Sequence, residues 1–262
     1  MGGARVIQDL LGQRAVVTGG ASGIGLAAAN LLARSGVRVT ILDLAAPPAG
    51  VQLDHLACDV TNQDSVTSAV ESASERGGGL DIVINSAGIG AIGTVLDNTD
   101  DEWHRLFDVN VLGVVRMMRA SAPHLRRSRS ASVVNVCSIA ATAGLPQRAA
   151  YTASKGALLA LTRAMAADHL SEGIRVNAVN PGTAATPWVE RLLNAADDPA
   201  SARASLEARQ PHGRLVTADE VAGAIAYLAG PGSASTTGTS IEVDGGMAAL
   251  RLPPRPPQGR SA

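Results

Sequence analysis

Short apolar runs and longer helical patterns alternate along the chain. The runs rich in Val, Ile and Leu predict strands at 14–20, 37–44, 81–88, 132–139, 174–182 and 238–246. Between them, Ala- and Leu-rich stretches predict helices at 24–35, 63–76, 100–126, 152–171 and 218–229. The runs are apolar almost throughout, which is typical of strands covered on both faces. The alternation predicts an α/β fold, a doubly wound parallel sheet with helices on both faces.

Two stretches depart from this pattern. Residues 183–217 lack a strand pattern and predict loops and short helices, expected to form a substrate lid because ligands of such sheets bind beyond the strands' carboxyl ends. Residues 251–262 hold four prolines and three arginines and predict a flexible tail more readily than a docking motif. There is no internal repeat or linker, so a single domain over 1–250 is expected.

Composition narrows the functional classes. A chain of 262 residues with 46% hydrophobic and 17% charged residues suits a compact, well-buried protein. The net charge of −1 offers no footprint for nucleic acid or an anionic membrane. No secretory signal or membrane-spanning run is visible. Cys58 and Cys137 lie at strand-like runs and are expected to be buried thiols, and the histidines lack metal-site spacing. A cytoplasmic location and no metal are therefore expected.

The first predicted strand runs into the glycine-rich segment "TGGASGIG" (18–25), and a helical pattern follows it. Glycines let the backbone turn tightly and approach a diphosphate, which then sits on the helix N-terminus. An ordinary glycine-rich turn is the alternative. The strand before the loop and the helix after it favour a dinucleotide site in a Rossmann-like sheet.

Asp43 ends the second predicted strand, 18 residues after Gly25. A carboxylate there accepts hydrogen bonds from the adenosine ribose hydroxyls and repels a 2′-phosphate. The glycine loop carries Ser22 and no basic residue, so it supplies no cation for that phosphate. NAD is therefore predicted over NADP, with a solvated surface aspartate as the alternative.

The segment "YTASK" (151–155) contains the only lysine of a chain in which the other 21 of 22 Lys and Arg residues are arginine. Tyr151 and Lys155 are four residues apart and share a helix face. Oxidation of an alcohol by NAD needs a base at the hydroxyl, and a nearby cation stabilises a phenolate in that role. Lysine's slender stem also reaches ribose hydroxyls, whereas a guanidinium is a wide fork. A surface helix with an amphipathic tyrosine is the alternative.

Together with "NSAG" (85–88) and "PG" (181–182), these motifs resemble the short-chain dehydrogenase/reductase family from about residue 10 to 248. Ser86 departs from the family's usual asparagine or alanine. The resemblance implies hydride transfer between a secondary alcohol and a ketone, a homotetramer, and a catalytic tetrad formed by Asn110, Ser138, Tyr151 and Lys155. It also implies cofactor contacts by Gly19, Ser22, Gly23, Ile24, Gly25, Asp43, Leu44, Asp59, Val60, Asn85, Ala87, Gly88, Tyr151, Lys155, Pro181, Gly182 and Thr186.

The segments "TPWVERLL" and "LEARQPHGRL" resemble a narrower branch with cytosolic 3-hydroxybutyrate and 2-keto-3-deoxy-L-fuconate dehydrogenases. In that branch arginines fix the substrate carboxylate, as a guanidinium fork can. Solvated lid arginines are the alternative reading, and Ala185 replaces an aspartate that is common in close relatives. Trp188 packs either against substrate or against the core. The substrate-binding residues implied are Ser138, Arg148, Tyr151, Trp188, Arg191 and Arg209.

The sequence leaves three other functions open. A free-sugar dehydrogenase of the fucose or rhamnose type and a reductase of 3-oxoacyl thioesters use the same chemistry. The thioester reductase usually favours NADPH, against which Asp43 argues. A non-catalytic NAD-binding regulator is the third, and such proteins commonly lose a tetrad residue, whereas this chain keeps all four.

Overall fold

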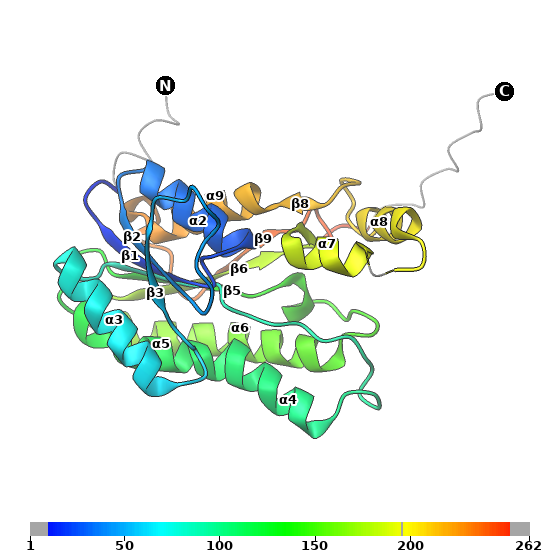
Figure 1. Ribbon diagram of the computed structural model, residues 1–262, viewed down its shortest axis with the longest axis horizontal. Helices are drawn as coiled ribbons and strands as arrows, with labels where there is room; N and C mark the ends of the chain where they lie inside the picture. Colours follow the sequence, from blue (N-terminus) through cyan, green and yellow to red (C-terminus); the bar gives the residue numbers. More distant parts are fainter. Residues whose placement is uncertain (1–9, 195, 252–262) are drawn as a thin grey trace.

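A computed structural model describes residues 10–194 and 196–251. Its centre is a seven-stranded sheet in which all pairs are parallel, in the order β3-β2-β1-β4-β5-β6-β9 (Figure 1). The strand order reverses between β1 and β4, so a ligand crevice opens at that point beyond the carboxyl ends of the strands. The strands are β1 (Arg14–Thr18), β2 (Arg38–Asp43), β3 (Asp54–Ala57), β4 (Ile82–Asn85), β5 (Ser132–Val136), β6 (Arg175–Pro181) and β9 (Ser240–Val243).

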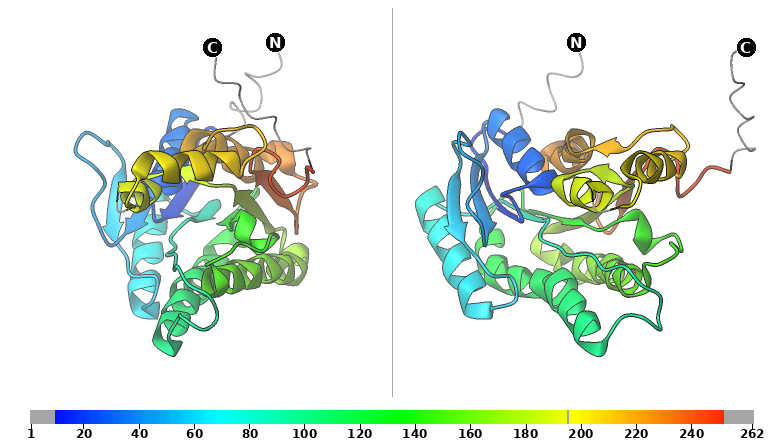
Figure 2. Two further views of the ribbon diagram at one scale, coloured as in Figure 1. Left: turned by 90° about the vertical axis from the view of Figure 1, so that its right-hand side faces the viewer. Right: turned by 45° about the vertical axis from the view of Figure 1, so that its right-hand side comes forward.

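Helices cover the sheet on both faces, which confirms the predicted fold class (Figures 1 and 2). The helices α2 (Gly23–Arg34) and α9 (Ala218–Ala229) pack together on one face. The opposite face carries α3 (Gln63–Gly77), α5 (Gly113–Leu125) and α6 (Ala149–His169). Neighbouring strand residues enter opposite cores, Val17 that of α2 and α9 and Val16 that of α3, α5 and α6. This two-sided burial explains why the strands read as continuous apolar runs.

The predicted elements were wrong in three respects: the ends of the strands, one missed strand and one helix that is divided. Each predicted strand extends one to three residues too far at its carboxyl end, because the residues that follow leave the sheet for the crevice. Strand β3 was missed, since the edge segment Asp54–Ala57 is half exposed and lacks an apolar run. The predicted helix 100–126 is divided into α4 (Asp100–Phe107), a π-helical turn (Asp108–Leu112) and α5.

The segment expected to form the lid contains α7 (Pro187–Asn194) and α8 (Pro199–Ala208). It was expected to lack strands, yet β7 (Ala184–Ala185) pairs in parallel with β8 (Val216–Thr217) at its base. Two-residue strands are too short to leave a sequence pattern. The ladder ties the two ends of the segment together. The remaining short helices are 3₁₀ turns at Ile139–Ala141, Leu170–Glu172 and Pro231–Ser233.

Within the described residues, no helix is both long and apolar enough to cross a membrane. The predicted tail lies outside the described residues except for Arg251, which is exposed.

Candidate active site

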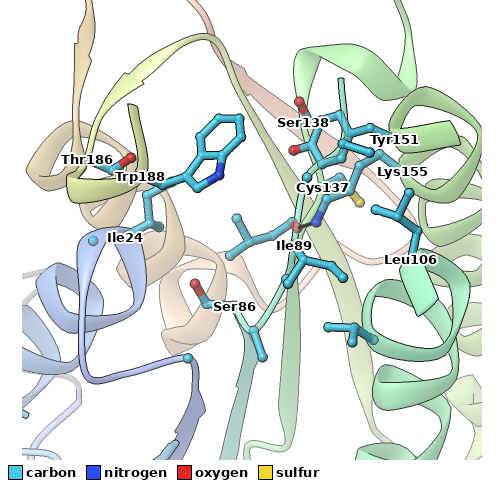
Figure 3. A pocket seen from close by; sticks show the side chains of 18 of the residues that line it. Ile24, Ser86, Ile89, Leu106, Cys137, Ser138, Tyr151, Lys155, Thr186 and Trp188 are labelled. Atoms are coloured by element: carbon cyan, nitrogen blue, oxygen red, sulfur yellow. Dashed lines mark hydrogen bonds between the residues drawn. The ribbon is translucent and has the colours of Figure 1, made fainter. Parts of the chain in front are cut away.

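A cavity of about 1420 Å³ opens at the carboxyl ends of the central strands, between the lid helix α7 and the rest of the domain (Figure 3). Most of the residues that the sequence singled out line it. Three do not: Gly25, Asn85 and Asn110. Those that do are Gly19, Ser22, Gly23, Ile24, Asp43, Leu44, Asp59, Val60, Ala87, Gly88, Ser138, Arg148, Tyr151, Lys155, Pro181, Gly182, Thr186, Trp188, Arg191 and Arg209.

The glycine loop is shaped by close backbone packing. Gly19 has φ 64°, and a Cβ there would lie 2.7 Å from the backbone nitrogen of Ala87. Gly25 is buried behind the loop, where a Cβ would overlap the carbonyl oxygen of Gly19. Ser22 is the N-cap of α2 and makes no side-chain cap hydrogen bond. The first-turn N–H groups of α2 and the open loop therefore suit a diphosphate.

Two carboxylates border the cavity where β2 and β3 end. Asp43 accepts hydrogen bonds from the backbone N–H groups of Ala21 and Ala45, each at 3.0 Å, and its oxygens keep further lone pairs. Asp59 accepts hydrogen bonds from the hydroxyl of Thr61 at 2.7 Å and its N–H at 2.9 Å, and these lower the pKa of Asp59. Both carboxylates are thus held in place by backbone or neighbouring groups at the cavity edge.

Lys155 is buried beneath Tyr151. Its Nζ donates a hydrogen bond to the carbonyl of Val136 at 2.9 Å and lies 5.9 Å from the centroid of the Tyr151 ring. Within the described part of the chain, no carboxylate forms an ion pair with Lys155. Its charge is therefore available to the phenol.

Burial raises the pKa of the neighbouring Cys137 thiol to about 11, so this thiol is protonated at neutral pH.

Ser138 lies next to Tyr151 at the cavity wall (Figure 3). It follows β5 and caps the 3₁₀ turn Ile139–Ala141, where its Oγ accepts a hydrogen bond from the N–H of Ala140 at 3.1 Å. This bond uses the oxygen as acceptor and leaves the hydroxyl hydrogen for a ligand.

Asn110 lies in the π-helical turn, where it is buried and does not line the cavity. Its Oδ1 accepts from the N–H of Ile89, and its Nδ2 donates to the Ile89 carbonyl, both at 2.9 Å. The same Nδ2 donates to Ser154 Oγ at 3.0 Å. The side chain thus fastens the loop after β4 to α6. Turns of this kind often occur at functional sites.

The family resemblance implies a cofactor contact at Asn85, but the structure places its side chain away from the cavity. Its amide is buried within the sheet and donates to Asn135 Oδ1 at 2.8 Å. The side chain of the last strand residue points into the helix-covered face, and the cavity begins only with Ser86. Thr18, which the sequence did not single out, supports this turn by accepting from the N–H groups of Ser86 and Ala87 at 3.1 Å.

Three arginines line the cavity beside the lid, and no ion pair of the described residues includes Arg148, Arg191 or Arg209. Arg148 donates to the carbonyl of Ala91 at 2.9 Å, and its guanidinium lies 5.7 Å from the Trp188 ring. Burial lowers the pKa of Arg148; Tyr151 opposes this shift and the charge of Arg209 adds to it. Arg148 and Arg209 are therefore close enough for their charges to repel each other, and no ion pair of the described residues neutralises either one.

Several cavity residues carried no signal in the sequence. Leu145 comes from the loop before α6, and Leu192 and Leu206 come from the lid helices. Isolated leucines in such segments look like ordinary core or surface positions, and only the folded lid brings them to the cavity.

The chain is similar to known proteins over most of its length. A family model described as "Enoyl-(Acyl carrier protein) reductase" matches residues 19–248. Over 90% of this chain and 96% of the relative, the sequence is 39% identical to cis-4-hydroxycyclohexanecarboxylate dehydrogenase of Sinomonas cyclohexanicum. It is 36% identical to 2-(S)-hydroxypropyl-CoM dehydrogenase 3 of Xanthobacter autotrophicus, over 89% of this chain and 96% of that relative.

Among solved structures, the ligand-free aldohexose dehydrogenase of Thermoplasma acidophilum superimposes with a TM-score of 0.90 at 32% identity, covering 96% of this chain and 99% of that chain. The fold, the glycine loop and the Tyr151–Lys155 pair thus define a nicotinamide-dependent oxidoreductase. The chain belongs to the short-chain dehydrogenase/reductase family. Its general chemistry is the interconversion of a secondary alcohol and a ketone.

Proposed function

We propose that the protein is an NAD-dependent dehydrogenase whose substrate is a secondary alcohol that also carries a carboxylate. The observation that carries this proposal is that Arg148, Arg191 and Arg209 line the same cavity as Tyr151 and form no ion pair within the described residues. Hydroxy acids such as 3-hydroxybutyrate or a sugar-derived keto-deoxy acid have the required groups. One relative's name, cis-4-hydroxycyclohexanecarboxylate dehydrogenase, describes such an acid.

The choice of NAD rests on Asp43. Its carboxylate lies at the cavity edge, fixed by the N–H groups of Ala21 and Ala45. A fixed negative charge there accepts hydrogen bonds from ribose hydroxyls and repels a 2′-phosphate. The glycine loop and the amides at the start of α2 hold the diphosphate. On the other side, Pro181, Gly182 and Thr186 flank the nicotinamide end.

Tyr151, Lys155 and Ser138 carry the proton chemistry. Ser138 donates its hydroxyl hydrogen to the substrate oxygen and holds it beside Tyr151. The Tyr151 phenolate removes the hydroxyl proton, and the charge of Lys155 stabilises that phenolate. Bound NAD supplies the acceptor for the hydride. In the reduction direction Tyr151 returns the proton as a general acid.

Arg148 orients the substrate through its carboxylate. One of its Nη atoms is engaged by Ala91, which fixes the guanidinium and leaves its other N–H groups for a ligand. Arg191 and Arg209 add positive charge on the lid side. By contrast, the lid residue Arg203 already donates to both carboxylate oxygens of Glu190, at 2.7 and 2.8 Å. The segment 183–217 then acts as the lid that covers the substrate.

Two other functions have a specific observation in their favour. The likeness to an aldohexose dehydrogenase favours a free sugar as substrate. The description of the matching family model favours an acyl carrier protein thioester. A non-catalytic role has the least support, because all four tetrad residues are present.

We also infer that the protein is cytoplasmic and forms a homotetramer, as the family resemblance implies. Its mass in solution, measured by light scattering, tests the assembly.

The deciding experiment compares initial rates of the purified full chain with a panel of hydroxy acids, neutral secondary alcohols and sugars, each with NAD and with NADP. A 3-oxoacyl thioester is assayed in the reverse direction with NADH and with NADPH. A higher kcat/KM for acids than for their neutral counterparts, with NAD preferred, supports the proposal. A clear preference for NADP would contradict the role given to Asp43. Preference for a free sugar or a 3-oxoacyl thioester would assign the protein to one of the two alternatives.

A further inference from the structure

The cavity beside Tyr151 has apolar walls. We call the part bordered by Tyr151, the loops before α6 and after β4, and the lid the substrate compartment. Its apolar lining residues come from three separate segments and are Ala91, Leu145, Trp188, Val189, Leu192 and Leu206. Of these, Val189 and Leu206 also pack into the small core of the lid around Leu193 and Leu215. Beside Tyr151 its polar side chains are those of Ser138, Tyr151 and the arginines 148, 191 and 209. Hydroxyl side chains of the same segments, Ser86, Thr183 and Thr186, also line the cavity. Thr186 lies toward the glycine loop, where a Cβ at Gly23 would lie 3.5 Å from its Cγ2. Along these segments, within the described residues, no amide, carboxylate or imidazole side chain lines the cavity.

The carboxylates that line the cavity elsewhere are those of Asp43, Asp59, Glu102 and Asp108, and the imidazole is that of His104. Asp43 and Asp59 lie where β2 and β3 end, on the cofactor side. Glu102 and His104 come from α4, on the opposite side of the molecule from α7 and α8 (Figures 1 and 2). Glu102 is already engaged, since its Oε2 accepts from the N–H of Thr99 at 3.1 Å. A substrate hydroxyl packed against Trp188 and Leu145 would therefore find no amide, carboxylate or imidazole side chain of these segments among the described residues, and its side-chain partners would be hydroxyl and guanidinium groups alone.

Trp188 places an apolar face directly beside a cation. Its ring projects from α7 into the cavity, opposite Ser138 and Tyr151 (Figure 3). The residue is 40% exposed, and a Cβ at Gly90 would lie 2.9 Å from its ring. The indole thus packs on bare backbone on one side and on Arg148 on another. A ligand that covers this exposed ring removes apolar surface from water.

We propose that the substrate is a compact hydroxy acid with an apolar body, such as a hydroxylated alicyclic carboxylate, and that the site rejects polyhydroxylated acids of the sugar-acid type. The carboxylate binds at Arg148, the carbinol faces Tyr151, and the apolar body packs on Trp188 and the leucines. Extra hydroxyls are excluded because burying them without partners is costly. This inference rests on the proposed function and narrows its substrate class.

Ligand binding can be measured by tryptophan fluorescence, because the chain has only two tryptophans. Removal of the base prevents turnover during the measurement. In a Trp103→Phe, Tyr151→Phe double variant, Trp188 is the sole indole and the base is absent. Its fluorescence is titrated, with NAD present, with cyclohexanecarboxylate, the neutral isostere cyclohexanecarboxamide, and gluconate. We expect a saturable change with cyclohexanecarboxylate, and dissociation constants at least roughly tenfold higher for the other two ligands.

The outcomes separate the two proposals. Gluconate binding as tightly as cyclohexanecarboxylate, with the amide weaker, overturns the apolar compartment and leaves the preference for an acid intact. The amide binding as tightly as the acid overturns the role given to the arginines. A response to none of the three overturns the inference.

A matched pair of leucine variants tests the wall itself. Leu145→Asn should weaken cyclohexanecarboxylate roughly tenfold and leave gluconate unchanged or tighter. The control Leu96→Asn changes a side chain that is 91% exposed and does not line the cavity, and should alter neither constant. An equal loss for both acids in Leu145→Asn would show that the residue supports the fold of the loop and does not select the ligand.

Discussion

The Nζ of Lys155 lies 5.9 Å from the ring centroid of Tyr151, and its hydrogen bond to the Val136 carbonyl holds it there. The side chain is buried and has no carboxylate partner among the described residues, so no ion pair there neutralises the charge that we propose acts on the phenol. We expect Lys155→Met to lower kcat by roughly 10² to 10⁴-fold. Lys155→Arg should lose nearly as much, because a wide guanidinium does not fit this slot.

Steady-state kinetics with circular dichroism to verify folding measure this effect. The control is Arg163→Met on the same helix, an exposed cation that should leave kcat unchanged. Full activity in Lys155→Met would refute the assignment.

Replacement of Asp43 should change cofactor preference. Asp43→Ser removes the fixed charge that repels a 2′-phosphate and the acceptor for ribose hydroxyls. We expect kcat/KM with NAD to fall by roughly tenfold or more and the NAD to NADP ratio to fall further. Asp54→Ser on the exposed edge strand is the control for loss of one negative charge. An unchanged ratio would mean that Asp43 only braces the glycine loop through Ala21.

Arg148→Met should separate acids from neutral alcohols. Loss of a charge-assisted hydrogen bond is expected to raise KM for the hydroxy acid between roughly tenfold and a hundredfold. The KM for a neutral secondary alcohol should change little. The lid variant Arg203→Met is the control, because this arginine is paired with Glu190 and does not line the cavity. Equal effects on both substrates would contradict carboxylate binding.

Gln210 fastens the base of the lid. It is buried, and its Nε2 donates to the carbonyls of Thr183 at 3.2 Å and Arg214 at 2.7 Å. In Gln210→Glu an acceptor would face both carbonyls, so we expect the segment between β7 and β8 to open more often. Limited proteolysis should cut that segment several times faster than in the native chain. Cleavage at an unchanged rate would mean that the β7–β8 ladder alone closes the lid.

Asp81 should make stability depend on pH. Burial by itself raises the pKa of this carboxyl, but hydrogen bonds from Arg14 and Ser128 outweigh it and the net shift is downward. The stabilisation is therefore present above the unfolded pKa of about 3.9 and is lost as pH falls through the folded value. Asp81→Asn should destabilise the fold by about 2 kcal/mol at pH 7, and the difference should shrink below about pH 4.

Urea unfolding at a series of pH values measures this dependence. Glu172→Gln, which removes a more exposed pair with Arg126, should cost less than Asp81→Asn. A loss for Asp81→Asn that stays constant down to pH 3 would contradict the linkage.

Local sequence determined the fold class and singled out most of the candidate site residues that the structure brings to the cavity. A strand buried on both faces is apolar at almost every position, as the neighbours Val16 and Val17 show. A glycine-rich loop between a strand and a helix is typical of a dinucleotide site. The pair Tyr151 and Lys155 was also visible, because a spacing of four places two side chains on one helix face. The apolar runs, the glycine loop and the spacing of four all depend only on residues that are close together in the sequence.

Tertiary structure decided what local patterns could not. The half-polar edge strand β3 exists because it pairs with β2, and β7 exists because it pairs with β8. Asn85 turned out to be buried against Asn135, because the direction of a side chain at a strand end depends on the covering helices. The apolar compartment around Trp188 comes from segments far apart in the chain. Its character is set by which side chains the folded lid brings together.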